Sequence, residues 1–373
     1  MGNVPNLRFP EFSGEWVTKS INDLAVVIGG GTPDTTVKSY WDGEIQWFTP
    51  SEIGKNKYVD SSLRTITEVG LNNSSAKLLP PNTILLSSRA TIGECSLSLR
   101  ECATNQGFQC LVSKKCNVDF LYYLIQTKKK DLIRKSCGST FLEISANEVR
   151  KIQVSVPSDV EQQKIAELLS LIDERIATQN KIIEDLKKLK SAIRKKMFSL
   201  LKDEYTESFE INQLLDYEQP TAYIVANDEY STDTSLTPVL TANKGFILGY
   251  TDEKFGIYQK GECIIFDDFT MDAKYVSFPF KVKSSAIKIL TAKPNVNLRF
   301  MFEYLSYWEL KSEGHKRHYI SEIASLVIEL PSKERQSIIA SLMTSLNSKL
   351  DIEAKTKIRY EEQKRYLLSQ MFI

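Results

Sequence analysis

The most constraining feature of this sequence is a long segment that occurs twice. Adding 174 to each residue number from 157 to 198 gives the second copy without a gap. Pro157-Ser158 thereby falls on Pro331-Ser332, and Met197-Phe198 falls on Met371-Phe372. An internal repeat of this size constrains the whole architecture. We therefore expect two similar halves.

Both copies have the spacing of long helices. Apolar residues recur every three or four positions, as along one side of a coiled-coil helix, and neither copy contains glycine or proline. Ser158 and Glu161 match a capping box at the first helix start, whereas Arg335 replaces the glutamate in the second copy. The predicted seam of the helix pair consists of Ile165, Leu169, Ile172, Ile176, Ile183, Leu186, Ile193, Ile339, Met343, Leu346, Leu350 and Leu367.

Two pairs of polar residues interrupt this seam at matched places. Gln179 falls on Glu353, and Lys190 falls on Lys364. Polar seam residues can fix the register of paired helices, so we interpret these as devices that make the two helices prefer each other. An ordinary oligomerisation coil is the open alternative.

The segments before the helices also resemble each other. At an offset of 179, residues 83–91 align with 262–270, and residues 105–111 align with 284–290. Apolar positions recur while the residues between them differ. The predicted fold is α+β: two similar mixed α/β domains joined by two long antiparallel helices, a pseudo-twofold dumbbell with a coiled-coil spacer. The predicted boundaries are domain 1 at 1–157, helix 1 at 158–203, domain 2 at 204–331 and helix 2 at 332–373.

Two domains with one fold and different loops are typical of binders of related but different ligands, because loops on a rigid scaffold carry binding differences. A pair of domains at a fixed separation suits a rod-like ligand with a repeating geometry. Duplex DNA is such a ligand, since equivalent sites on one face recur about every 34 Å.

Composition and motifs exclude several other classes. The chain has 373 residues and a formal net charge of +1, which excludes a histone-like binder but allows local basic faces. The six cysteines form no Cys-x-x-Cys pair, and no metal site is expected at the two histidines. No apolar run reaches the length of a membrane span and no signal-peptide core is present, so we expect a cytoplasmic protein. Motifs for phosphate loops, hydrolases, kinases and adenine methyltransferases are missing, which predicts no catalysis.

Three local patterns give further expectations. Residues 3–16 are rich in proline and aromatic residues, which indicates an irregular arm held to the body by its rings. The Gly29-Gly30-Gly31 run is interpreted as a mobile loop close to a ligand. A single helix is expected from Val118 to Lys135, carrying the Lys128-Lys129-Lys130 run.

Several motifs, in their order along the chain, resemble those of a known family. They are Leu7-Arg8-Phe9-Pro10-Glu11-Phe12 with Trp16, Gly30-Gly31-Thr32-Pro33, residues 103–108 (Ala-Thr-Asn-Gln-Gly-Phe), Pro-Ser before each helix, and residues 161–166 (Glu-Gln-Gln-Lys-Ile-Ala). Over essentially its whole length the chain resembles the specificity (S) subunit of type I restriction-modification enzymes.

The resemblance implies two target recognition domains, each reading one half of a bipartite, gapped sequence in double-stranded DNA. It implies that the helix pair sets the gap and docks two methyltransferase (M) subunits. These partners would carry S-adenosylmethionine, and motor-nuclease (R) subunits would use ATP and Mg²⁺. The S subunit itself performs no chemistry and needs no cofactor or metal. The assembly serves DNA methylation and phage defence.

Base reading needs hydrogen-bonding side chains at base edges, and phosphate binding needs Lys or Arg. Asn and Gln suit adenine, Arg89 suits guanine, and Asp267 suits cytosine. The candidate DNA contacts in domain 1 are Thr32, Lys38, Thr49, Ser51, Lys55, Lys57, Ser88, Arg89, Asn105, Gln106, Ser139 and Thr140. Those in domain 2 are Asn243, Lys244, Asp267, Asp268, Lys274, His315, Lys316, Arg317 and His318.

Two alternatives stay open at this point. The first is a coiled-coil scaffold with two protein-binding heads, which would show no binding to duplex DNA at low salt. The second is the DNA-reading subunit of another phage-defence methylation system, which would lack a motor-nuclease partner.

Overall fold

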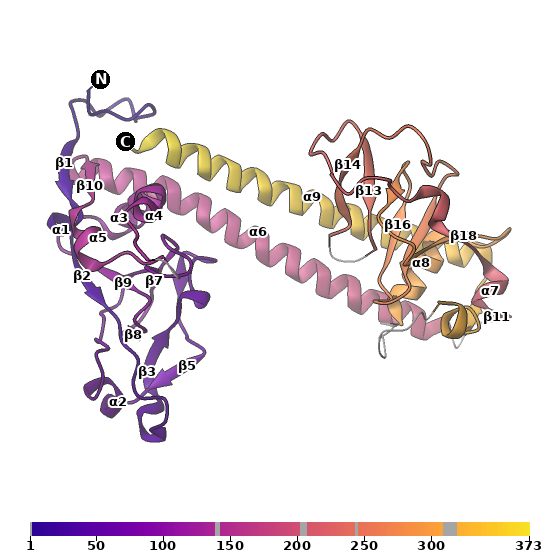
Figure 1. The fold of residues 1–373 in the computed structure, drawn as a ribbon, viewed down its shortest axis with the longest axis horizontal. Helices are drawn as coiled ribbons and strands as arrows, with labels where there is room; N and C mark the ends of the chain where they lie inside the picture. The colour runs from indigo at the N-terminus through magenta and orange to yellow at the C-terminus, as the bar shows by residue number, and fades with distance from the viewer. Residues whose placement is uncertain (1, 139–141, 202–206, 243–244, 309–318) are drawn as a thin grey trace. The chain divides into compact units, whose positions relative to one another are not determined.

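The computed structural model describes residues 2–138, 142–201, 207–242, 245–308 and 319–373 (Figure 1). The chain divides into two compact units: unit 1 comprises Met1–Lys181 with Ala354–Ile373, and unit 2 comprises Ile182–Glu353. The long helices α6 (Asp159–Leu200) and α9 (Lys333–Met371) are shared, because each unit takes one part of each helix. The mixed helix and sheet content predicted from the sequence is confirmed.

Unit 1 begins with a sheet-rich domain. Its elements before α6 are β1 Val17–Ser20, α1 Ile21–Leu24, β2 Ala25–Gly29, η1 Lys38–Tyr40, β3 Trp41–Phe48, η2 Pro50–Glu52, β4 Tyr58–Val59, β5 Arg64–Ile66, α2 Glu68–Asn72, β6 Ile84–Leu86, β7 Cys95–Ser98, β8 Cys102–Thr104, β9 Gln109–Ser113, α3 Val118–Thr127, α4 Lys129–Arg134, α5 Ala146–Lys151 and β10 Gln153–Val156.

Unit 2 contains a corresponding set between the two long helices. Its elements are β11 Glu207–Glu210, α7 Ile211–Leu214, β12 Leu215–Glu218, η4 Pro220–Tyr223, β13 Thr237–Leu240, β14 Ile247–Thr251, β15 Cys263–Asp267, β16 Ala273–Val276, β17 Lys281–Val282, β18 Ile287–Ala292, α8 Leu298–Tyr307, η5 Tyr319–Ile323 and β19 Val327–Leu330.

The two units repeat one strand topology. The main sheet has the order β2-β9-β6-β7 in unit 1, with β4 at its edge, and β12-β18-β15-β16 in unit 2. The smaller sheet is β5-β3-β8 in unit 1 and β14-β13-β17 in unit 2. In both small sheets the middle strand pairs antiparallel with the first strand and parallel with the third. The repeat seen in the sequence therefore extends to segments with little sequence identity.

Each unit packs a short amphipathic helix between its main sheet and the long helices. In unit 1 this helix is α3, whose Phe120 lies in one apolar cluster with Leu169 and Met371. In unit 2 it is α8, whose Phe300 lies in one cluster with Phe198. Burial of these faces is the main favourable contribution to the stability of each unit.

In unit 1 the contacts between the two long helices show that they run in opposite directions. In unit 1, Asp173 contacts Lys364, and two residues further along α6 Arg175 lies over the ring of Tyr360. The partner number falls as the α6 number rises, which is the signature of an antiparallel pair. All twelve predicted seam residues are buried or half-buried.

A buried glutamine fixes the start of each long helix. Gln162 Nε2 donates to the Pro157 carbonyl at 3.0 Å, and Gln162 Oε1 accepts from Asn117 N at 3.1 Å. Gln336 repeats this arrangement 174 residues later, with Pro331 at 2.9 Å and Asn297 N at 2.8 Å. Asn117 and Asn297 in turn cap α3 and α8. One side chain thus ties the start of a long helix to the start of a short one.

Replacing Gln162 with alanine is expected to lower the free energy of unfolding of unit 1 by about 2–3 kcal/mol. The change leaves the part-buried Asn117 N–H and the buried Pro157 carbonyl without the glutamine side chain that binds them. Urea denaturation followed by circular dichroism measures the loss. The neighbouring Gln163→Ala is the control, because Gln163 is exposed and its loss is expected to cost less than about 1 kcal/mol. Equal costs at both positions would contradict this role.

The predicted capping box forms only in part. Ser158 Oγ accepts from the Glu161 backbone N–H, but the Glu161 carboxylate binds Arg8 instead of the helix start. Arg8 Nε and Nη2 each donate to this carboxylate at 2.8 Å, and Trp16 Nε1 donates to it at 3.3 Å. The N-terminal arm is therefore attached by this buried ion pair as well as by its rings.

Two further expectations are corrected by the structure. The predicted helix from Val118 to Lys135 is divided at Lys128, whose φ of −91° and ψ of 8° end α3 and precede α4. The glycine run is closely packed rather than open: a Cβ on Gly30 would lie 2.0 Å from the Asn105 carbonyl oxygen, and one on Gly31 would lie 2.2 Å from Ser75 Oγ. These glycines are needed because backbone approaches backbone.

Among the described helices, none is both long enough and apolar enough to cross a lipid bilayer.

Candidate nucleic-acid interface

In unit 1 several loops meet where strands of the two sheets end. β3 and β8 are parallel neighbours, so Phe48 lies opposite Thr104 and the loops that follow them start together. The loop after β2 joins them, because Gly31 N donates to the Thr104 carbonyl at 2.8 Å. The loop after β6 joins through Ser88 N, which donates to the Gly107 carbonyl at 2.8 Å. We call residues 30–32, 49–52, 87–89 and 105–107 the unit 1 loop cluster.

Polar side chains in this cluster hold one another in place. Thr32 Oγ1 donates to Gln106 Oε1 at 2.6 Å, and both residues are exposed. Asn105 Oδ1 accepts from Gly107 N at 2.8 Å, which shapes the loop after β8. Thr49 Oγ1 lies 3.1 Å from Ser51 Oγ. The structure therefore brings Thr32, Thr49, Ser51, Asn105 and Gln106 together as one patch of hydroxyl and amide groups.

Arg89 adds a cation to this patch. It is about half-exposed, and it forms an ion pair with Glu143, with Nε at 3.2 Å from the carboxylate. Its neighbour Ser88 is fully buried and is needed by the fold: its N–H bonds Gly107 and its carbonyl accepts from Ile144 N. Ser88 is therefore removed from the set of residues that we propose to contact DNA.

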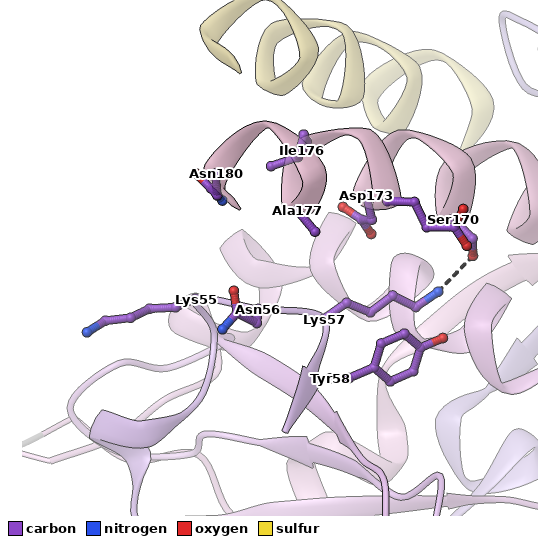
Figure 2. Close-up of a pocket in the computed structure, with 10 residues that line it drawn as sticks. Lys55, Asn56, Lys57, Tyr58, Ser170, Asp173, Ile176, Ala177 and Asn180 are labelled. Atoms are coloured by element: carbon purple, nitrogen blue, oxygen red, sulfur yellow. Dashed lines mark hydrogen bonds between the residues drawn. The ribbon is translucent and has the colours of Figure 1, made fainter. Parts of the chain in front are cut away.

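The three candidate lysines of domain 1 lie away from the loop cluster. Lys38 belongs to η1, at the opposite end of β3 from Thr49. Lys55 is exposed and Lys57 is not: both line a cavity of about 310 Å³ against α6 (Figure 2). The Lys57 side chain is 6% exposed, with its Nζ 2.6 Å from Asp119 and 2.7 Å from Ser170. Its ammonium group is bound to Asp119 and Ser170, so Lys57 too is removed from the proposed contacts.

The electrostatic character of the cluster is mixed. Hydrogen bonds from Thr36 hold the pKa of Asp34 below its usual value, so this exposed residue near Thr32 is charged at neutral pH. The Glu52 carboxylate accepts from Thr49 N at 2.8 Å and from Leu63 N at 2.6 Å, and it is thereby bound to its own loop. The cluster thus contains hydroxyl, amide and guanidinium groups, with the charged Asp34 carboxylate nearby.

Three cations of the basic stretch on α3 and α4 are bound to neighbouring residues. Lys128 Nζ donates to the Ile373 carbonyl at 2.6 Å, and Lys129 pairs with Glu94. Arg134 pairs with Asp131 at 2.8 Å. These three side chains are thus engaged within unit 1.

In unit 2 the two candidate aspartates are used by the fold. Asp267 Oδ1 accepts from Phe269 N and Thr270 N, both at 2.9 Å, and so closes the turn between β15 and β16. Asp268 is 1% exposed; its Oδ1 accepts from Tyr319 N at 2.7 Å and its Oδ2 lies 3.4 Å from Lys288 Nζ. Carboxylates engaged in this way are not presented to cytosine. We therefore remove both from the proposed contacts.

The sequence alignment set Asn105 on Ser284, but the structure sets it on Lys283, and the residues of this loop were not among the candidate contacts. Lys283 N donates to the Leu240 carbonyl at 3.1 Å, as Asn105 N donates to Phe48 at 3.1 Å. The exposed residues Lys283, Ser284 and Ser285 therefore stand where unit 1 has Asn105 and Gln106. The loop is one residue longer in unit 2, which a gap-free offset of 179 could not reveal.

Of the remaining candidates of domain 2, Lys274 alone lies among the residues that the structure describes. Lys274 is half-buried on β16, at the edge of the main sheet. The other calls lie outside the described residues, and so do two of domain 1; they are Ser139, Thr140, Asn243, Lys244, His315, Lys316, Arg317 and His318.

Comparison with known proteins decides the family. The sequence profile of the family described as "Type I restriction modification DNA specificity domain" matches residues 13–188 and again residues 204–362. The chain belongs to this family. It carries two copies of the specificity domain, and the resemblance to type I specificity subunits drawn from its motifs is confirmed.

Individual relatives agree with this assignment. The chain is 38% identical over 216 residues to the specificity subunit of the type I restriction enzyme MjaIX of Methanocaldococcus jannaschii, covering 57% of this chain and 50% of that protein. It is 39% identical over 178 residues to the EcoR124I/EcoR124II specificity subunit of Escherichia coli, covering 43% of each chain. The aligned part of the chain thus spans about half the length of these curated relatives.

A solved structure supports the fold over the full length. The crystal structure of the type I restriction-modification S subunit from M. genitalium superposes with a TM-score of 0.65 at 17% identity, covering 99% of both chains. At this identity the similarity concerns the fold.

Proposed function

We propose that this chain is the DNA sequence-specificity subunit of a type I restriction-modification complex. Each unit would read one half of a bipartite, gapped target in double-stranded DNA. The observation that carries this proposal is the repetition of one strand topology with different loops at the same strand ends. Equal scaffolds with unlike loops suit two short and different sequences on one duplex.

In unit 1 the exposed and half-buried polar members of the loop cluster are the proposed base readers. Gln106 and Asn105 can pair with adenine, and Arg89 can pair with guanine. Thr32, Thr49 and Ser51 would add hydroxyl contacts to bases or phosphates. In unit 2 the loop at Lys283–Ser285 takes the corresponding place, together with Lys274.

The long helices would set the unspecified gap and dock methyltransferase subunits. Support for docking comes from exposed apolar residues on α6, which are Val160 and Leu171 in unit 1 and Ile182, Leu189 and Leu200 in unit 2. At about 100° per residue, their spacing places all five on one side of the helix. Apolar residues aligned on one helix side are typical of an interface with a partner.

The subunit itself would perform no chemistry. Methyl transfer from S-adenosylmethionine and ATP-driven translocation would belong to M and R subunits in the cytoplasm. The family membership favours DNA reading over the alternative of a scaffold with protein-binding heads. A complex that methylates its target but contains no motor-nuclease would identify the other phage-defence arrangement.

Replacing Arg89 with alanine is expected to weaken recognition at one half-site only. Loss of a bidentate contact to guanine costs about 1–3 kcal/mol, a decrease of roughly 5- to 150-fold in affinity. The complex with M subunits is assembled, and its methylation is measured on targets with single changes in each half. Relaxation limited to one half supports the assignment of one unit to one half.

The matched control is Arg100→Ala. Arg100 also pairs with an acid, Asp60, at 2.7 Å. Arg89 follows β6 near the Cys95 end of β7, whereas Arg100 follows the opposite end of β7, at Ser98. It is expected to leave both half-sites unchanged. Equal relaxation of both halves by Arg89→Ala would show that one unit does not read one half.

A further inference from the structure

A polar node joins three helices inside the otherwise apolar packing of unit 1. Tyr123 on α3 donates its hydroxyl to Asp173 on α6 at 2.7 Å, and Lys364 on α9 lies 2.7 Å from the same carboxylate. Tyr123 is fully buried, and the Asp173 and Lys364 side chains are 15% and 16% exposed. Burial, together with the Asp173 charge, raises the pKa of Tyr123, so the phenol stays a donor. We call these three residues node 1.

Unit 2 has a node at the corresponding place. Glu303 on α8 is fully buried, and Arg194 on α6 lies 2.8 Å from its Oε2. Asn347 on α9 donates to Glu303 Oε1 at 3.2 Å, and Lys190 on α6 lies 3.9 Å from that oxygen. We call Glu303, Asn347, Lys190 and Arg194 node 2.

The internal repeat relates the two nodes residue by residue. The offset of 174 places Asp173 on Asn347 and Lys190 on Lys364. Tyr123 and Glu303 both lie six residues after the asparagine that caps their helix. Both nodes therefore contain a lysine at the same repeat position. The carboxylate differs in location: it is Asp173 on a long helix in node 1 and Glu303 on the short helix in node 2.

This difference has an electrostatic consequence. If α3 occupied the place of α8, a tyrosine would face Lys190, Arg194 and Asn347. The two largely buried cations would then lose the buried carboxylate of Glu303, and Lys190 would keep only the weaker influence of Asp351. If α8 occupied the place of α3, Glu303 would stand against Asp173. Removing one partner of a buried ion pair, or burying two like charges together, is strongly unfavourable.

We propose that Tyr123 and Glu303 are positioning residues that match each recognition domain to its own stretch of the long helices. The location of the single buried carboxylate specifies which domain fits which stretch. A recognition domain moved between the two places then has to bring the residue at 173 or 347 with it. This proposal rests on the proposed function only for its consequence on DNA reading.

Lys57 extends node 1 into the domain. Its Nζ lies 5.0 Å from the centre of the Tyr123 ring and 2.6 Å from the part-exposed carboxylate of Asp119. It also donates to Ser170 on α6 (Figure 2). A carboxylate placed at position 123 would therefore find two cations, Lys57 and Lys364, as Glu303 finds Lys190 and Arg194. Node 1 can thus be converted into the pattern of node 2.

The test is a substitution cycle at node 1, measured as the thermal unfolding midpoint of the full chain without DNA. Tyr123→Glu and Tyr123→Gln are compared in two backgrounds, wild-type Asp173 and Asp173→Asn. The two replacements have nearly the same size and lose the same ring, so their difference reports charge alone. In the wild-type background, glutamine is expected to give the higher midpoint; in the Asp173→Asn background, glutamate is expected to give it, each by roughly 5 °C or more.

The same order in both backgrounds would overturn the proposal, because a merely structural role of Tyr123 predicts no reversal. Node 2 gives an independent test without loss of a ring. Glu303→Gln is expected to lower the midpoint with Asn347 and to raise it with Asn347→Asp. The combination of Asp173→Asn with Asn347→Asp keeps the net charge but moves the acid to the wrong node, and it is expected to lower the midpoint below either single change.

A second measurement separates this proposal from the proposed function. The node 1 variants are assembled with M subunits, and discrimination at each half-site is measured below the unfolding temperature. Mismatched variants are expected to lose at least tenfold discrimination at the half read by unit 1, and matched ones to recover it. A reversal in unfolding without any change at a half-site would refute the reading of that half by unit 1 and would leave the node pairing intact.

Discussion

Replacing Gly30 with valine is expected to lower the free energy of unfolding of unit 1 by about 3 kcal/mol and to weaken reading of one half-site. The added Cβ would lie 2.0 Å from the Asn105 carbonyl oxygen and 2.5 Å from that of Thr104. Both atoms belong to the backbone where β8 ends, so the clash is relieved only by moving the strand and its loop. Denaturant unfolding gives the stability loss, and methylation of half-site variants gives the effect on reading.

The neighbouring glycine supplies the control. A Cβ on Gly29 would lie 3.7 Å from Gln109 Oε1, which is an ordinary contact. Gly29→Ala is therefore expected to change stability by less than about 0.5 kcal/mol. If both substitutions had the same cost, the close approach of Gly30 to Asn105 would not be the cause.

This glycine run shows one limit of reading the sequence. Three glycines in succession have the same composition whether they allow motion or allow backbone to approach backbone. Which of the two applies depends on Ser75 and Thr104, which are distant in sequence. The sequence identified the position as special, but the neighbours that decide its role are brought there by the fold.

The candidate site shows the same limit more sharply. Thr32, Asn105 and Gln106 were singled out by residue type, and the structure places them in one loop cluster, with Thr32 and Gln106 exposed and Asn105 half-buried. Asp267 and Asp268 have equally suitable types but cap a turn and a buried backbone N–H. A polar residue after a strand satisfies either a ligand or its own backbone, and residue type alone does not distinguish these uses.

Long-range periodicity was far more informative. The 174-residue repeat predicted both long helices, because an apolar spacing of three to four residues over so many turns has few other solutions. The role of the polar seam residues was less accessible. Lys190 and Lys364 were interpreted as a means for the long helices to recognise each other. Lys364 on α9 does pair with Asp173 on α6, whereas Lys190 lies 3.9 Å from Glu303 on the short helix α8. The sequence comparison considered the two long helices alone, so it could not show that the short helix α8 contributes a partner.

Lengthening both long helices by one heptad is expected to move the two half-sites apart by about three base pairs. Seven helical residues add about 10 Å, and duplex DNA rises about 3.4 Å per base pair. A copy of residues 175–181 is inserted after Lys181 in α6, and a copy of residues 354–360 is inserted before Ala354 in α9. A heptad keeps every seam residue on its side of the helix. The assembled complex is then tested on targets whose gap grows one base pair at a time.

Insertion of the heptad into α6 alone is the control for this experiment. Each unit holds one part of α6 and one part of α9, so lengthening one helix changes one connection between the units and leaves the other unchanged. The single insertion is therefore expected to strain the contacts of Lys364 with Asp173 or of Asn347 with Glu303, and to reduce methylation at every gap length. The double insertion is expected to restore methylation at a longer gap. Activity of the double insertion at the original gap would show that the helices do not set the spacing.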